Sequence, residues 1–290
     1  MKIAITGANG FLAGYVLQEV ISSGNSCVLV TRKPGERFGI DFFMSDYSKN
    51  SLMDILKDSD AIVHLASTRK VYEGILDYKQ ELQITENLYA AAHALGIQNI
   101  IFASSISVYS GTDLPYTEKT IPNPAGVYGL SKLVCEQIGN QYSSKYGMKI
   151  KNFRFAHLYG ANEDNNYMIN RFFRQGYHHE QMTVHAQSIA KREFLYAKDA
   201  AKAVMVGLNQ KELSGAFNIG STEYLTNEEI AKIICSAMSP EMEVMLGSET
   251  ETIESSYMDS SKMMNTLGYR PQYTLFSATK EIQNAMRKNV

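Results

Sequence analysis

The feature that most constrains the fold is the junction between the first apolar strand and the first helical segment. The run Lys2–Thr6 is typical of a buried strand, and Phe11–Ser22 repeats its apolar residues with the period of a helix. The turn between them has the pattern G-x-x-G-x-x-A, formed by Gly7, Gly10 and Ala13. In such a turn the backbone can approach a pyrophosphate at the positive N-terminus of the helix. The junction therefore predicts a dinucleotide-binding unit at the start of the chain.

The same alternation of strands and helices continues through the first half of the chain. Further strands and long helices are predicted, in chain order, at Ser26–Thr31, Ala61–Ala66, Tyr78–Leu95, Asn99–Ser104, Val127–Tyr146 and Lys149–Phe155. Strands that are separated by helices of this length form right-handed crossovers, which build a parallel sheet with both faces covered. We therefore expect an α/β fold, a Rossmann-type doubly wound parallel sheet with a smaller, mostly helical C-terminal substrate lobe.

The regular alternation ends after Gly160. A polar stretch follows, then an aromatic-rich, helix-like segment at Tyr167–Tyr177, and a strand–helix pattern returns at Arg192–Asn209. From Thr226 onward helical patterns dominate. We interpret this order as two interleaved parts, a dinucleotide-binding domain of residues 1–160 and 190–222 and a substrate-binding lobe of residues 161–189 and 223–290.

Composition and charge exclude several classes of protein. The 28 Lys and Arg residues are balanced by 30 Asp and Glu residues, so no basic field for nucleic acid is expected. No run of about 18 apolar residues occurs, and the strand at the N-terminus leaves no room for a signal peptide. The three cysteines, Cys27, Cys135 and Cys235, lack metal-ligand spacing. We expect a cytoplasmic protein with free thiols, no bound metal, no nucleic-acid partner and no membrane span.

A phenol and an ammonium stand four residues apart in the predicted helix Val127–Tyr146. Tyr128 and Lys132 therefore share one face of the helix, and a buried ammonium lowers the pKa of a neighbouring phenol. A tyrosine in this setting acts as an acid or a base near neutral pH. A hydroxyl that holds a substrate oxygen is available at Ser104 or Ser105, where a buried strand ends. The combination predicts an acid–base site beside the dinucleotide loop.

The residues after the second strand bear on the choice of dinucleotide. NAD sites place an acidic residue there to accept the ribose hydroxyls, whereas NADP sites favour a cation for the 2′-phosphate. Arg32 and Lys33 follow the strand, and the first acidic residue is Glu36. We therefore favour NADP over NAD, with Arg32 as the phosphate contact. The alternative is that Arg32 and Lys33 only cap a surface loop.

Together these features resemble the extended short-chain dehydrogenase/reductases of the NAD-dependent epimerase/dehydratase family, whose members modify nucleotide sugars. The similarity spans nearly the whole chain and rests on the segments TGANGFLAG, HLA, FASSISVYS, RFAHLYG, FNIGS and LGYRP. Within the third segment the match selects Ser105 as the catalytic serine, rather than Ser104 or Ser107, because Ser105 lies four residues before Tyr109. The family mechanism implies that hydride moves to or from a nicotinamide at a sugar carbon.

The resemblance also implies a role for each candidate residue. The catalytic set is Ser105, Tyr128 and Lys132, in which Lys132 tunes Tyr128 and holds the nicotinamide ribose. The cofactor-binding residues are Gly7, Asn9, Gly10, Phe11, Leu12, Arg32, Asp46, Tyr47, Leu65, Ala66, Ser67, Tyr128 and Lys132. The substrate-binding residues are Ser105, His157 and Arg192.

Three departures from the family pattern narrow the reaction. Dehydratases of the family carry an Asp-Glu pair after the catalytic serine, where this chain has Ile106 and Ser107, so dehydration is not expected. Members that combine 3,5-epimerisation with reduction place a cysteine where this chain has Ser107. The arginine that pairs with the sugar diphosphate in many members is missing from Ser255–Lys262, which leaves Arg192 as the candidate for that contact.

Three functions are consistent with these residues. The first is an NADPH-using reductase of a keto group on a nucleotide-linked sugar. The second is a nucleotide-sugar 4-epimerase with tightly bound NAD, which the missing acid after the second strand disfavours. The third is a dinucleotide-binding regulator without turnover, which the intact Ser105, Tyr128 and Lys132 disfavour.

The two long helices bear on assembly. Tyr78–Leu95 and Val127–Tyr146 match the helices that family members pair into a dimer, so we expect a homodimer. Their amphipathic pattern is explained equally well by packing within one subunit.

Overall fold

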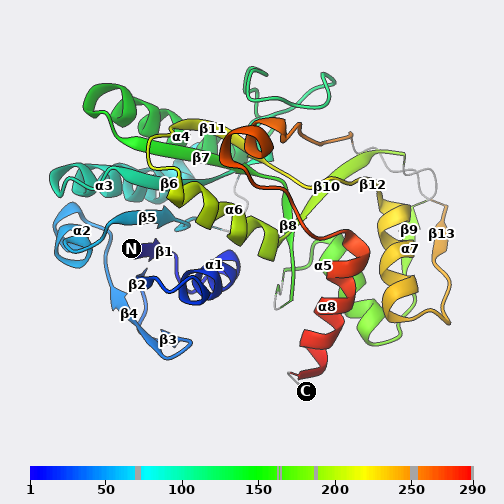
Figure 1. Cartoon of the computed structure of the whole chain (residues 1–290). Coiled ribbons are helices and arrows are strands. Elements are labelled where there is room, and N and C mark those ends of the chain that lie inside the picture. Colours follow the sequence, from blue (N-terminus) through cyan, green and yellow to red (C-terminus); the bar gives the residue numbers. More distant parts are fainter. Residues whose placement is uncertain (69–72, 162, 164, 186–188, 249–253, 289–290) are drawn as a thin grey trace.

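The computed structural model describes all residues except 69–72, 162, 164, 186–188, 249–253 and 289–290. Its centre is an eight-stranded sheet with helices on both faces, and a mostly helical lobe lies at one end (Figure 1). The strand order in the sheet is β11-β7-β6-β5-β1-β2-β4-β3. The predicted fold class, a Rossmann-type sheet with a smaller C-terminal lobe, is confirmed.

The parallel strands of the sheet arise from the apolar runs of the sequence. They include β1 (Lys2–Thr6), β2 (Ser26–Thr31), β5 (Ala61–His64), β6 (Asn99–Ser105), β7 (Lys149–Phe155) and β11 (Gly215–Ile219). β1 pairs with β2 on one side and with β5 on the other. The strand order reverses at β1, because the chain first adds strands on the β2 side of β1 and then adds strands on the β5 side. In a doubly wound sheet, ligands bind at the carboxyl ends of the strands where the order reverses.

Helices cover both faces of this sheet. On one face α1 (Phe11–Ser22) packs against α6 (Ala197–Asn209), and on the other lie α2 (Lys49–Leu56), α3 (Lys79–Ala94) and α4 (Val127–Tyr146) (Figure 1). Successive residues of β1 belong to opposite cores, since Ile3 and Ile5 pack with α1 and α6, whereas Ala4 packs with α2 and α3. This alternation is the two-residue period of a strand that is buried on both faces.

The lobe combines helices with small sheets. Its helices are α5 (Met168–Tyr177), α7 (Asn227–Met238) and α8 (Leu275–Lys288), and its paired strands are β8 (His157–Tyr159), β10 (Lys191–Tyr196) and β12 (Tyr224–Thr226), with β9 (Thr183–His185) beside β13 (Met245–Gly247). Phe172, Ile230 and Ile282 lie in a separate core among the helices. β10 pairs with β8, outside the eight-stranded sheet. The sequence interpretation places β8 and β10 in the dinucleotide-binding domain, whereas both strands pair outside the large sheet. The division into residues 1–160 with 190–222 and 161–189 with 223–290 stays an interpretation.

Several elements escape the sequence patterns. The hairpin of β3 (Glu36–Arg37) and β4 (Ile40–Met44) lies at the edge of the sheet, where mostly exposed residues give no apolar run. In α2 only Leu52 and Leu56 are buried, too few to set a clear period. The strand β5 ends at His64, two residues before its predicted end.

Short helical turns complete the described elements, at Ile75–Tyr78, Ile106–Val108 and Met263–Leu267. Within the residues that the structure describes, none of the helices has the length and apolar character needed to cross a membrane.

Candidate active site

The glycine loop lies where the strand order reverses. Gly7 has a φ of +66°, and a Cβ there would lie 2.8 Å from the backbone nitrogen of Ala66. Glycine adopts a positive φ readily and has no Cβ to clash with Ala66, so the loop can lie directly against the end of β5. The Thr6 hydroxyl fixes this contact by accepting hydrogen bonds from the Leu65 and Ala66 N–H groups, both at 3.2 Å. Predicted cofactor-binding residues from β1 and β5 are thereby brought together.

The N-terminus of α1 has no acceptor supplied by its own residues. Its N-cap is Gly10, which provides no capping side chain, and the first turn holds no acidic residue. Asn9 is exposed, while Phe11 and Leu12 are partly buried. The first N–H groups of a helix carry partial positive charge and need an acceptor. The residues present therefore fit the pyrophosphate of a dinucleotide.

Tyr47 and Arg32 lie on the β2 side of this loop. The Tyr47 hydroxyl accepts a hydrogen bond from the Gly7 N–H at 3.2 Å and donates one to the Val30 carbonyl at 3.1 Å. Arg32 is exposed and donates to the side-chain oxygen of Gln80 at 2.8 Å. A hollow of about 400 Å³ is lined by Arg32, Met44, Ser45, Asp46 and Gln80. Tyr47 thus braces the glycine loop, and Arg32 shares a hollow with Asp46.

Arg37 is a residue of this region that the sequence patterns do not reveal. Its guanidinium donates hydrogen bonds to the Ala8 and Gly10 carbonyls, at 2.9 and 2.7 Å. A Cβ at Gly14 would lie 2.7 Å from the same guanidinium, so Arg37 also covers the start of α1. Arg37 stands on the two-residue strand β3, and no local motif marks it. The edge hairpin therefore fastens the glycine loop from outside.

The catalytic candidates Ser105 and Tyr128 come from β6 and α4. Ser105 ends β6, and Tyr128 lies in the first turn of α4. A Cβ at Gly129 would overlap the Ser107 carbonyl oxygen, so the helix touches the chain just after β6. This close approach places the first turn of α4, which carries Tyr128, against the end of β6, which carries Ser105. The Ser105 hydroxyl also lies 3.1 Å from that of Ser107. The Tyr-x-x-x-Lys spacing predicts Tyr128 as a site residue, whereas no sequence pattern marks the close approach at Gly129.

Lys132 lies one helical turn after Tyr128 and is 2% exposed. Its ammonium is 5.7 Å from the centroid of the Tyr128 ring. The same ammonium is 2.9 Å from a carboxylate oxygen of Glu81 and 2.8 Å from the Ser67 hydroxyl. Burial is the largest single cause and lowers the pKa of Lys132, but Glu81, Tyr128 and Cys135 together raise it, so the net shift is upward. The sequence patterns do not reveal Glu81, because it occupies a polar position in an ordinary helix.

The pKa of Tyr128 is raised overall. Burial is the largest cause and raises it, the Lys132 ammonium lowers it, and the Glu81 carboxylate raises it again. The hydrogen bond with Ser105 lowers the pKa, and Tyr167, which precedes α5, raises it. The effect predicted for Lys132 has the expected sign, but burial and Glu81 outweigh it in this structure.

The two predicted substrate residues stand on neighbouring strands of the lobe. His157 begins β8 and Arg192 lies in β10, and the two strands run parallel. His157 lies just beyond the end of β7, and Phe155, the last residue of β7, pairs with Ser105 at the end of β6. Burial, and secondly the charge of Arg192, lower the pKa of His157 to about 4. His157 is therefore neutral at pH 7.

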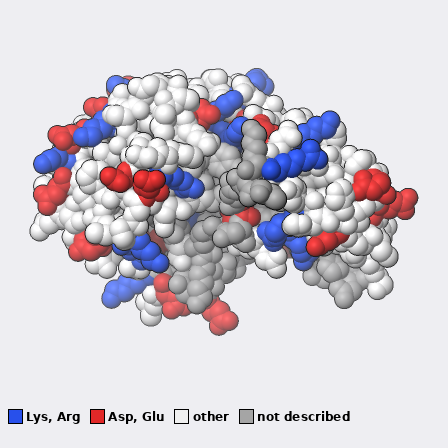
Figure 2. Space-filling model, turned by 90° about the horizontal axis from the view of Figure 1, so that it is seen from below, with Lys and Arg blue, Asp and Glu red and all other residues white. Residues whose placement is uncertain are grey.

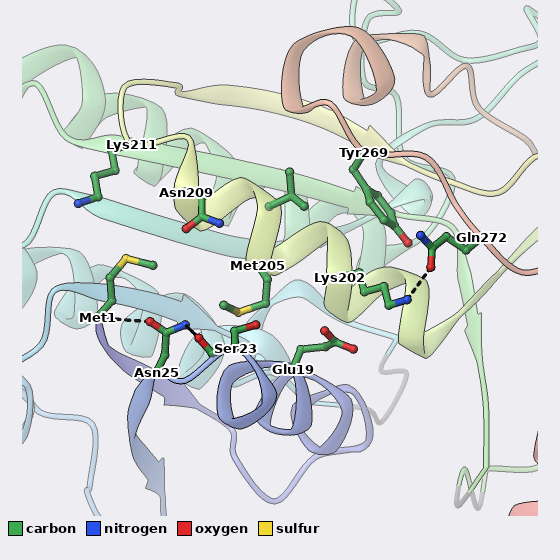
Figure 3. A pocket seen from close by; sticks show the side chains of 11 residues that line it. Met1, Glu19, Ser23, Asn25, Lys202, Met205, Asn209, Lys211, Tyr269 and Gln272 are labelled. Atoms are coloured by element: carbon green, nitrogen blue, oxygen red, sulfur yellow. Dashed lines mark hydrogen bonds between the residues drawn. The ribbon is translucent and has the colours of Figure 1, made fainter.

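A larger hollow lies elsewhere, between α1 and α6. It measures about 700 Å³, and Figure 3 shows Glu19, Lys202 and Tyr269 around it. The amine of Met1 donates to the Asn25 side chain at 2.8 Å within this group. The residues that line the hollow include none of the predicted site residues. The larger hollow is therefore separate from the glycine loop and α4, which carry most of the predicted site residues.

On the face drawn in Figure 2, Lys and Arg side chains are interspersed with Asp and Glu. Across the part of the chain that the structure describes, no group of His, Cys, Asp and Glu side chains is arranged to hold a metal ion.

Comparisons with known proteins agree with the resemblance inferred from the motifs. The sequence profile of the NAD dependent epimerase/dehydratase family matches residues 3–220. A crystal structure of UDP-N-acetylglucosamine 4-epimerase from Bacillus cereus is 48% identical, covers 99% of this chain and 96% of that chain, and has a TM-score of 0.92.

More distant relatives also match this chain over nearly its full length. A putative UDP-glucose 4-epimerase from Methanocaldococcus jannaschii is 25% identical over an alignment that covers 99% of both chains. UDP-glucose 4-epimerase from Thermus thermophilus, solved in complex with NAD, is 21% identical, with a TM-score of 0.85 and full coverage of both chains. At this identity the last comparison concerns the fold alone.

Proposed function

Because the chain belongs to the NAD-dependent epimerase/dehydratase family of extended short-chain dehydrogenase/reductases, we propose that it is a nucleotide-sugar 4-epimerase. The observation that carries this proposal is the 48% identity, over nearly the full length of both chains, with a UDP-N-acetylglucosamine 4-epimerase. The proposed substrate is accordingly a UDP-linked hexose such as UDP-N-acetylglucosamine. This is the second of the three functions that the sequence suggested.

The proposed chemistry uses Tyr128 as the group that moves a proton. Its phenolate removes the proton of the sugar 4-hydroxyl and later returns it to the 4-keto oxygen. Ser105 donates a hydrogen bond to the same sugar oxygen, and Lys132 stabilises the ionised form of Tyr128. Gly7, Gly10 and Lys132 would hold a nicotinamide dinucleotide, which would supply a reversible acceptor for the hydride of the sugar carbon.

The same site gives no support to dehydration. Ile106 follows Ser105 and is buried and apolar, so it offers no acid or base to remove water from the sugar. Ser107 supplies a hydroxyl that already contacts Ser105. On the lobe side, we propose that Arg192 pairs with the diphosphate of the substrate and that neutral His157 contacts the substrate beside it.

The epimerase proposal is tested by incubating UDP-N-acetylglucosamine with the protein as purified, without added dinucleotide. An epimerase with bound cofactor converts the sugar into a mixture with its 4-epimer, which NMR of the anomeric protons resolves. If neither this sugar nor UDP-glucose forms its 4-epimer, the proposal is wrong.

A keto-sugar reductase is the second candidate, and Arg32 is the observation that favours it. Arg32 is exposed at the end of β2, where an acid would serve NAD, and it lines a hollow with Asp46. A reductase exchanges its dinucleotide in every turnover, and Arg32 would then hold the 2′-phosphate of NADP. Calorimetric titration of the stripped protein discriminates the two. Much tighter binding of NADPH than NADH favours the reductase, and NAD that cannot be stripped favours the epimerase.

We also propose a cytoplasmic homodimer joined through α3 and α4. Leu130 and Tyr146 of α4 are 39% and 38% exposed, which provides apolar surface on this helix. Sedimentation equilibrium measures the mass directly, and a mass of one chain would contradict the dimer.

A further inference from the structure

Glu81 and Lys132 form a buried ion pair between α3 and α4. Glu81 stands in the first turn of α3 and is 4% exposed, and its carboxylate lies 2.9 Å from the Lys132 ammonium. The proposed function uses Lys132 beside Tyr128 but gives Glu81 no part. Withdrawing a carboxylate from water is costly, so its place against this lysine calls for an explanation.

Both carboxylate oxygens of Glu81 are engaged. One accepts from the Lys132 ammonium and from the Ser67 hydroxyl, at 2.9 and 3.0 Å, and the other accepts from the Thr68 N–H at 3.1 Å. Ser67 in turn accepts a hydrogen bond from Lys132 at 2.8 Å. The ammonium is thus held from two sides, which fixes its position relative to Tyr128. Glu81 also ties α3 to the segment after β5.

Stability alone does not account for this pair. A buried ion pair adds little net stability compared with two well-packed apolar side chains, because desolvation offsets most of the attraction. The surroundings are partly apolar, since the Phe102 ring lies 5.3 Å from the Lys132 ammonium. The pair differs from an apolar one in supplying a fixed ammonium and a compensating negative charge next to Tyr128.

We propose that Glu81 is a positioning residue of the epimerase site, which holds the Lys132 ammonium in place and offsets part of its positive charge at Tyr128. The inference rests on the proposed function for its effect on turnover. Its effect on the ionisation of Tyr128 requires no substrate and can be measured separately.

The charges that act on Tyr128 come from several elements. Burial makes the largest contribution and raises the pKa of Tyr128, Lys132 of α4 lowers it, and Glu81 of α3 raises it. Tyr167, ahead of α5, also raises it. Other titratable groups of the described residues that interact with Lys132 are Cys135 of α4 and His64 of β5. Removing the Glu81 charge while the Lys132 ammonium stays near Tyr128 therefore lowers the pKa of Tyr128.

The variant Glu81→Gln removes the charge and keeps the length of the side chain. We expect the pKa of Tyr128 to fall by about one unit, a shift typical of a neighbouring charge. The measurement is a pH titration, by carbon-13 NMR, of the ring carbon that bears the hydroxyl, in the protein with its dinucleotide bound. The Tyr128 signal is assigned by its loss in Tyr128→Phe. The acid limb of the kcat profile should move to lower pH by the same amount.

Glu86→Gln is the matched control. Glu86 lies on the same helix, its carboxylate accepts a hydrogen bond from Tyr142 at 2.8 Å, and it is not among the groups that shift the pKa of Tyr128. The control should leave the pKa of Tyr128 unchanged. If Glu81→Gln also leaves it unchanged and only lowers the melting temperature, the proposal is overturned and Glu81 is structural.

A second variant applies if Glu81→Gln does not fold. Glu81→Asp keeps the charge but shortens its reach, so kcat should fall about tenfold, while KM and the pKa of Tyr128 stay near their original values. An unchanged kcat would overturn the positioning role.

The two proposals fail separately. Without any epimerase activity, a lowered pKa of Tyr128 in Glu81→Gln would contradict the proposed function and retain the role of Glu81. If the protein shows epimerase activity but the pKa of Tyr128 is unchanged in Glu81→Gln, the proposed function stands and the role of Glu81 is contradicted.

Discussion

The dinucleotide half of the site and the lobe half are built by different means. In the dinucleotide half, backbone contacts set the geometry, because Gly7 lies against Ala66 and Gly129 lies against Ser107. In the lobe half, His157 stands on a strand of three residues. A close backbone contact requires glycine, and at Gly7 that glycine belongs to a recognisable sequence pattern. A side chain on a short strand belongs to no such pattern. We therefore expect the first half to define the chemistry and the second to define the substrate.

This difference predicts distinct kinetic effects of substitution. Changes in the dinucleotide half should lower kcat, whereas changes in the lobe should raise KM and leave dinucleotide binding intact. The variants below test this separation in order of decreasing effect.

Tyr128→Phe should have the largest effect. Removing the phenolic hydroxyl abolishes proton transfer, which contributes about 10²–10⁴-fold to rate, while the dinucleotide still binds. Turnover and calorimetric dinucleotide binding are measured on the same preparation. Tyr146→Phe, on the same helix, is the control and should be fully active. Unimpaired turnover in Tyr128→Phe would exclude its assigned role, and no turnover in any variant or in the original protein would favour the regulator hypothesis.

Gly129→Ala should lower turnover by about a hundredfold, the cost of displacing a reacting group by about 1 Å. The added methyl overlaps the Ser107 carbonyl and pushes α4 away from the turn that follows Ser105. Gly126→Ala is the matched control, because a Cβ at Gly126 meets no atom within 4 Å. Equal activity of the two variants would show that this close approach does not position Tyr128.

Arg192→Ala should raise KM for the nucleotide sugar by about 10–100-fold, as expected for loss of a charge-assisted hydrogen bond. Values of kcat and dinucleotide affinity should change much less. Lys191→Ala, next to it and exposed, serves as the control. An equal loss of dinucleotide affinity would break the separation between the two halves.

His157→Gln should have the smallest effect, on stability at acid pH. The pKa of His157 is about 4 in the folded protein and near 6.5 when unfolded, so the unfolded chain binds the extra proton between these values. The contribution of neutral His157 to the free energy of unfolding is therefore fully present above about pH 6.5. It decreases by at most about 1.4 kcal/mol per pH unit as the pH falls toward 4. Denaturant unfolding at several pH values should give a shallower slope for His157→Gln. An unchanged slope would mean that His157 does not titrate as described.

Much of the sheet, and the place of several candidate site residues within it, could be predicted from the sequence. The bounds of β1, α1, β2, α4 and β7 agree with the prediction to the residue, because each is a clear apolar pattern that ends at a turn. Motifs predict Ser105 and Tyr128 as site residues, and the elements that carry them, β6 and α4, pack against each other.

The remainder depends on contacts between distant segments. Arg37 reaches the glycine loop from an edge hairpin, and Glu81 reaches Lys132 from another helix. Neither the residue type nor its spacing in the sequence predicts such a contact, because charged side chains on an edge hairpin or on a polar helix position are usually solvated. For the same reason, the net effect of burial on the pKa of Tyr128 could not be read from the Tyr128 and Lys132 spacing.

The most direct test of the account is the fate of deuterium placed at C4 of UDP-N-acetylglucosamine. The protein as purified is incubated with the labelled sugar, and the product is analysed by NMR and mass spectrometry. Reversible oxidation at C4 on a bound dinucleotide predicts that the 4-epimer forms and keeps its deuterium at C4. A 4-epimer with hydrogen at C4, or no 4-epimer while NADPH is consumed with a 4-keto sugar, would contradict the proposed epimerase.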